Sequence, residues 1–125
     1  HVNFGLMPGG GSTQRLPRKV GERRAVELLL TGRWLSGKEA EEWGLVTRAV
    51  PADGLEEELK TLLATLTGKS RDGLGWIKRA VSASRSMTLR EGVDFEVKAF
   101  ARLVATSPDP REGIEAFREK RAPRF

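Results

Sequence analysis

The chain has 125 residues, 38% of them hydrophobic and 31% charged, a balance that excludes a disordered protein. It contains no cysteine, which excludes disulfides, thiolate metal sites and cysteine nucleophiles. His1 is the only histidine, so we expect no metal site and no internal Ser-His-Asp triad. The longest purely aliphatic run, Leu28–Leu30, is far shorter than the roughly 20 residues of a membrane span, and we expect no membrane partner.

The charge balance is basic, because 22 Lys and Arg against 17 Asp and Glu give a net charge of +5. Such an excess favours anionic partners, among them phosphates, CoA-like cofactors, nucleic acid and acidic lipids. The basic residues are interspersed with acidic ones, which favours an ordinary solvated surface over a dedicated nucleic-acid interface. The chain begins with neither an initiator Met nor a signal peptide, and we interpret it as a fragment of a longer protein.

The N-terminal region holds two candidate features. The imidazole of His1 is a candidate general acid or base, with a mobile chain end as the alternative. Pro8–Arg15 has consecutive glycines before a helix start, where backbone N–H groups can approach a ligand closely. It matches neither a P-loop, which needs a following Lys, nor a dinucleotide fingerprint, since Gln14 stands where the third glycine would be. It is either a binding loop or a tight turn capped by Ser12.

The remainder of the chain has the pattern of a mainly α-helical protein. Apolar residues at helical spacing predict helices over five segments: 21–31, 55–66, 74–81, 89–104 and 109–117. Capping-box patterns, with Glu three residues later, predict helix starts at Ser36, Asp53, Thr88 and Asp109. Two segments, 33–36 and 45–50, are expected to be short strands or extended pieces, the second because it is β-rich and ends at Pro51.

The C-terminal tail, residues 117–125, is basic with interleaved aromatic residues. Lys and Arg bind phosphates and an aromatic face stacks on a base, so the tail is a candidate clamp for a phosphate and an adenine ring. A frayed, solvated tail is the alternative. A helix continuing from 109 would place Phe117 and Arg121 on one face, with Lys120 beside them.

Four segments, taken in order, carry a resemblance that extends over the whole chain: Phe4–Arg18, Glu39–Val46 followed by Val50-Pro51, Thr88–Glu91, and Arg111–Arg121. They resemble the crotonase (enoyl-CoA hydratase/isomerase) family. The resemblance implies the C-terminal helical part of the crotonase-like α/β fold. Residues 1–50 would form the end of the core with the glycine-rich loop, and residues 51–125 a helical region for oligomerisation and CoA contact.

The resemblance also implies an acyl-CoA thioester as substrate, no covalently bound cofactor, a cytoplasmic location, and a homo-oligomer that is a trimer or a dimer of trimers. Gly9 matches the glycine whose backbone N–H holds the attacking water, and Gly10 beside it is a cofactor-binding candidate. Phe117, Lys120 and Arg121 match the residues that meet the adenine and phosphates of CoA.

The sequence departs from the hydratase pattern at His1, which stands where hydratases carry their second catalytic Glu. The reaction therefore stays open among hydratase, isomerase, dehalogenase-like, thioesterase-like and inactive members. Because half of the family's active site would lie upstream, we expect this chain alone to be inactive. The alternative function, from another class, is a non-catalytic helical module for oligomerisation or nucleic-acid binding.

Overall fold

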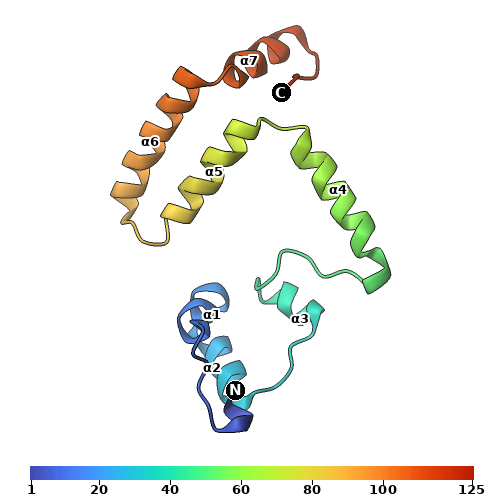
Figure 1. Ribbon diagram of the computed structural model, residues 1–125, viewed down its shortest axis with the longest axis vertical. Helices are drawn as coiled ribbons and strands as arrows, with labels where there is room; N and C mark the ends of the chain where they lie inside the picture. Colours follow the sequence, from blue (N-terminus) through green and yellow to red (C-terminus); the bar gives the residue numbers. More distant parts are fainter. The chain divides into compact units, whose positions relative to one another are not determined.

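The computed structural model describes residues 1–125 as helices joined by turns, without a strand (Figure 1). The elements in chain order are η1 (Val2–Phe4), α1 (Ser12–Val20), α2 (Glu22–Thr31), α3 (Gly37–Glu42), η2 (Ala52–Gly54), α4 (Leu55–Thr67), α5 (Arg71–Ala83), α6 (Leu89–Thr106) and α7 (Asp109–Glu119). The chain forms two compact units, His1–Glu58 and Leu59–Phe125. The mainly helical fold expected from the sequence is confirmed.

In the first unit, α1 and α2 pack side by side (Figure 1). They bury Val20 and Ala25, and the reversal between them is made at Gly21, whose φ of +83° suits glycine. Helix α2 ends at Gly32, also left-handed at φ +61°. A Cβ on Gly32 would lie 2.8 Å from Oδ1 of Asn3, so only glycine lets η1 approach the end of α2 this closely.

Helix α3 begins with a complete capping box. The hydroxyl of Ser36 accepts from the N–H of Glu39 at 3.2 Å, and the Glu39 carboxylate accepts from the N–H of Ser36 at 3.0 Å. Hydrogen bonds from Ser36 hold the pKa of Glu39 below its usual value, and the bond from the Ser36 backbone N–H has the largest effect. Arg33 links this cap to α2 through Glu39 at 3.1 Å and Glu27 at 3.0 Å.

The two expected extended segments, 33–36 and 45–50, do not form strands. Residues 45–47 are a series of bends after α3, and 48–50 lack regular structure. A strand needs a neighbouring strand for its backbone hydrogen bonds, and β-rich composition alone does not supply one.

In the second unit, α5 and α6 form a hairpin, and α7 packs against α6 (Figure 1). The predicted capping box at Thr88 is present and opens α6. Helix α5 has a cap that was not predicted from the sequence: the hydroxyl of Ser70 accepts from the N–H of Gly73 at 2.9 Å and donates to the carboxylate of Asp109 at 2.6 Å. This hydroxyl therefore joins the starts of α5 and α7.

The capping predictions at Asp53 and Asp109 are wrong. Asp53 lies inside the 3-10 turn η2, which leads directly into α4, and Asp109 is the first residue of α7 after Pro108. Neither carboxylate accepts a helix-capping hydrogen bond, and that of Asp109 is taken by Ser70 instead.

The two units bury few side chains. Only five hydrophobic residues are buried, and four of them are alanines: Val20, Ala25, Ala40, Ala99 and Ala116. The apolar face of α4 is uncovered along its length, since its five leucines are between 39 and 60% exposed: Leu55, Leu59, Leu62, Leu63 and Leu66. The predicted helical periodicity is correct, but the helices keep their apolar faces largely exposed.

Candidate functional site

The glycine-rich segment is an open loop leading into α1. Gly11, at φ +89°, is the N-cap, and its carbonyl accepts from the N–H groups of Gln14 at 3.1 Å and Arg15 at 2.9 Å. Ser12 is the first helical residue and makes no cap hydrogen bond, so the alternative of a Ser12-capped turn is wrong. No atom lies within 4 Å of a Cβ built on Gly9 or Gly10, and their N–H groups donate to no acceptor in the chain.

His1 is exposed and precedes the short helix η1. Its backbone carbonyl accepts from the N–H groups of Phe4 at 2.9 Å and Leu6 at 3.1 Å, while its imidazole makes no hydrogen bond within the chain. His1 and Pro8 line the same cavity of about 370 Å³, together with Trp34 from the segment after α2. The first unit therefore brings His1 close to the glycine-rich loop.

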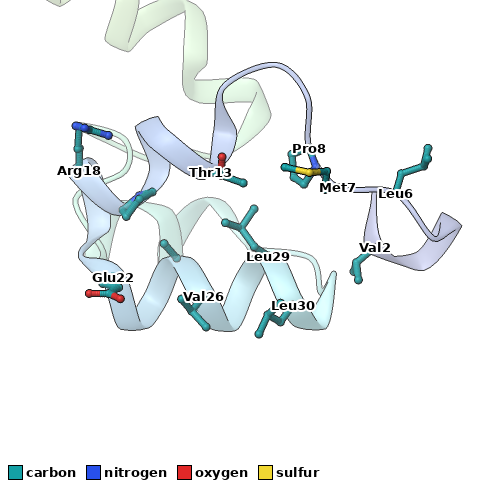
Figure 2. A pocket seen from close by; sticks show the side chains of 12 residues that line it. Val2, Leu6, Met7, Pro8, Thr13, Arg18, Glu22, Val26, Leu29 and Leu30 are labelled. Atoms are coloured by element: carbon teal, nitrogen blue, oxygen red, sulfur yellow. The ribbon is translucent and has the colours of Figure 1, made fainter.

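A larger pocket lies under the start of this loop, between η1 and the α1–α2 pair (Figure 2). Its volume is about 660 Å³, and its walls are mainly apolar, with Arg18 and Glu22 at one end and Val2 and Leu6 at the other. The remaining lining residues are Met7, Pro8, Thr13, Pro17, Ala25, Val26, Leu29 and Leu30. This pocket could not be predicted from the sequence, because only α2 has a periodic apolar face there and no pattern indicates that η1 lies opposite it.

The C-terminal tail leaves α7 earlier than the sequence predicted. The helix ends at Glu119, and Lys120 has a left-handed backbone at φ +55°, the only non-glycine residue with positive φ. The N–H of Lys120 bonds the carbonyl of Phe117 at 3.3 Å, and the N–H of Arg121 bonds that of Ala116 at 3.0 Å. This pair of bonds is a Schellman motif with lysine in glycine's usual place. The left-handed conformation costs a non-glycine residue about 1–2 kcal/mol.

Arg121 does not share a helix face with Phe117, contrary to the prediction, since it lies beyond the end of α7. Its guanidinium donates to both oxygens of Glu112, at 2.6 and 3.1 Å, and to Glu119 at 2.5 Å. The hydrogen bond to Glu112 is the first cause of a raised Arg121 pKa. Two hydrogen bonds lower the pKa of Glu112 to about 2: the larger effect comes from the Arg121 side chain and the smaller from the backbone N–H of Arg124.

The other two tail candidates remain exposed. The ring of Phe117 is 84% exposed, and the ammonium of Lys120 has no ion-pair partner in the chain. Phe125 folds back beside Gly113 of α7, where a Cβ would lie 3.7 Å from its ring. The structure thus brings Phe117 and Lys120 together at one end of α7 and occupies Arg121 with carboxylates.

No cluster of three or more His, Cys, Asp or Glu is arranged to hold a metal ion. None of the helices has the length and apolar character needed to span a membrane.

Comparison with known proteins gives one consistent result. The model of the enoyl-CoA hydratase/isomerase family matches residues 1–125. A Mycobacterium leprae protein named "Probable enoyl-CoA hydratase" is 43% identical over 124 residues, which are 99% of this chain and 48% of that protein. The 1,2-epoxyphenylacetyl-CoA isomerase of Escherichia coli is 39% identical over 122 residues, covering 98% of this chain and 46% of its own.

Solved structures agree with the sequence relatives. An enoyl-CoA hydratase structure from Geobacillus kaustophilus superimposes with a TM-score of 0.92 at 47% identity, covering 99% of this chain and 48% of that one. The chain thus spans about half the length of the curated relatives it matches. The alternative of a nucleic-acid-binding or oligomerisation module is not favoured by these matches.

Proposed function

Because the chain belongs to the enoyl-CoA hydratase/isomerase family, we propose that the whole protein acts on an acyl-CoA thioester as a hydratase or isomerase. The observation that carries the proposal is the match of the family over residues 1–125, with named hydratases and an isomerase among the relatives. The geometry agrees with it, since the first unit offers free backbone donors next to a mainly apolar pocket, and the second offers the exposed ring of Phe117 and, three residues on, the exposed Lys120.

The glycine-rich loop is the proposed reacting end of the site. The unpaired N–H groups of Gly9 and Gly10 stand near the N-terminus of α1, where the helix dipole also favours negative charge. Donors of this kind can hold a water molecule or a developing oxyanion of the thioester. The pocket under the loop would accept the acyl group, because its walls are mainly apolar side chains.

His1 is the proposed proton-transfer group. An imidazole can accept or donate a proton near neutral pH, and its side chain is free of hydrogen bonds within the chain. By the family resemblance it stands where hydratases carry a carboxylate. In this protein an imidazole would therefore replace a carboxyl group as the group that transfers the proton.

The tail is the proposed CoA-binding end, with Lys120 meeting an anionic group and Phe117 the adenine ring. We expect Lys120→Glu to weaken CoA binding of the whole protein by about 1–3 kcal/mol, the scale of a lost charged hydrogen bond, and to leave folding nearly unchanged. Isothermal titration calorimetry with CoA measures this. The matched control is Lys98→Glu, the same change at another exposed lysine. Equal affinities of Lys120→Glu and the unchanged protein would contradict the assignment.

Catalysis is proposed for the whole protein and not for residues 1–125 alone. The chain spans about half of its relatives, and no carboxylate lies in the loop from His1 to Gly11. We expect no measurable hydration of crotonyl-CoA by residues 1–125. The assay measures hydration as the loss of absorbance of the enoyl thioester. Turnover in the ordinary range of roughly 1–10³ per second would contradict this expectation.

The whole protein is further proposed to be a cytoplasmic homo-oligomer, a trimer or a dimer of trimers, with no covalently bound cofactor. The exposed apolar helix faces support association, because stable monomers rarely expose so much apolar surface.

A further inference from the structure

The carboxylate of Glu112 is bonded three times by the tail that follows α7. It accepts from Nη1 and Nη2 of Arg121, at 2.6 and 3.1 Å, and from the backbone N–H of Arg124 at 2.7 Å. Glu112 lies in the first turn of α7, while both of its partners lie after the last. Its side chain is 23% exposed, so the contact is partly shielded from water. One side chain thus ties the chain end back to the beginning of the helix.

Arg121 has little capacity left for another anion. Its two terminal nitrogens face Glu112, its Nε faces Glu119 at 2.5 Å, and Nη1 also reaches the carbonyl of Ala122 at 3.3 Å. A phosphate approaching this guanidinium would also meet two carboxylates of like charge. Lys120, directly before it, is left-handed and has a free ammonium.

We propose that Glu112 is a positioning residue: acting through Arg121, it fixes the tail so that Lys120 points its ammonium at an anionic group of the CoA thioester. Arg121 holds the tail through its hydrogen bonds to Glu112 and does not itself bind phosphate. This inference rests on the proposed function for its ligand, and it reassigns one of the three tail residues that the family resemblance had placed at CoA.

The test is a double-mutant cycle in the whole protein with Glu112→Gln, Arg121→Gln and their combination. If the two residues act together, each single substitution weakens CoA binding about three- to tenfold. The double variant then binds CoA no more weakly than either single variant. KM for the enoyl-CoA substrate rises while kcat is unchanged, because the tail does not touch the reacting atoms. The matched control is Glu115→Gln, which breaks the 2.8 Å pair with Arg111 on the same helix and should change neither constant.

A second measurement follows the tail without any ligand. Amide hydrogen exchange of residues 121–125 should become faster in Glu112→Gln and stay unchanged in Glu115→Gln, because only the former replaces the carboxylate that accepts the Arg124 N–H with a neutral amide, which is a weaker acceptor.

Three results would overturn the inference. Tighter CoA binding by Glu112→Gln would mean that releasing Arg121 makes it a phosphate ligand. Fully additive losses in the cycle would give the two residues independent roles. A fall in kcat that parallels a fall in Tm would leave only a structural role. If the unchanged whole protein binds no CoA, the proposed function is wrong, and so is the claim that the tail presents Lys120 to CoA. The hydrogen-exchange measurement then decides by itself whether Glu112 holds the tail.

Discussion

Lys120 combines backbone strain with a free positive charge. A residue in a sparsely populated conformation persists where its surroundings or its function require it, and here the Schellman bonds supply the surroundings. Glycine at this position would relieve the strain but remove the charge. Lys120 is therefore the residue at which stability and ligand binding should oppose each other.

We expect Lys120→Gly to stabilise the protein by about 1 kcal/mol, because glycine adopts positive φ without a Cβ clash. The same change should weaken CoA binding about tenfold, which corresponds to 1.4 kcal/mol. Thermal unfolding and calorimetry of the whole protein measure the two effects. Lys120→Ala is the control, since it removes the charge and keeps the strain. A loss of stability in Lys120→Gly would show that the lysine side chain itself holds the tail.

The pKa of Glu112, lowered to about 2, predicts how the tail responds to acid. The usual pKa of a glutamate is 4.5, so the hydrogen bonds of the ionised carboxylate stabilise the folded tail fully above pH 4.5. This stabilisation is lost as the pH falls towards 2 and the carboxylate is protonated. We expect the Arg124 amide resonance in NMR spectra to titrate with a midpoint near pH 2, and not to titrate in Glu112→Gln. A midpoint near 4.5 would mean that the three hydrogen bonds to Glu112 do not persist in solution.

At the scale of elements, two hydroxyl caps differ in what else they bind. Thr88 caps α6 within its own capping box, whereas Ser70 caps α5 and also donates to the carboxylate of Asp109. The second bond joins residues 39 positions apart, so Ser70 contributes to tertiary structure as well as to helix initiation.

We expect Thr88→Ala to cost about 1 kcal/mol, the usual value for a lost N-cap, and Ser70→Ala to cost about 2 kcal/mol because a hydrogen bond to a carboxylate is lost as well. Urea unfolding of residues 1–125 measures both. Ser84→Ala is the control, since the Ser84 hydroxyl bonds only the carbonyl of Val81 in the preceding turn. The reverse order of the two losses would contradict the tertiary role of Ser70.

Helix starts were predictable where the cap is purely local. The hydroxyls of Ser36 and Thr88 bond only the backbone and side chain of the Glu three residues on, and both capping boxes are present as predicted. Asp53 and Asp109 have the same four-residue pattern but do not cap, because a 3-10 turn precedes α4 and Ser70 takes the Asp109 carboxylate. A local pattern cannot distinguish these cases, since the competing partner is distant in sequence.

At the scale of the whole molecule, the exposed apolar faces predict association. Residues 1–125 should form oligomers at tens of micromolar, because burying apolar surface between copies is favourable. Sedimentation velocity measures the species present. Leu62→Glu with Leu66→Glu, on the exposed face of α4, should shift the distribution towards monomer, while Thr61→Glu on the same helix should not. A clean monomer of the unchanged chain would contradict the prediction.

The sequence by itself determined the helical class, most helix boundaries and the family, because apolar periodicity, local caps and short motifs are written in neighbouring residues. It also located the glycine-rich loop and the tail. Only the tertiary structure decided that Gly9 and Gly10 keep free N–H groups next to a pocket that η1 helps to line, and that Arg121 is held by Glu112. The prediction that Phe117 and Arg121 share a face assumed a helix that continues past 119. The chain instead turns at Lys120 through the Schellman bonds, and the bonds from Arg121 and Arg124 to Glu112 then hold the tail against the start of the same helix. Those bonds to Glu112 have no signature in local spacing.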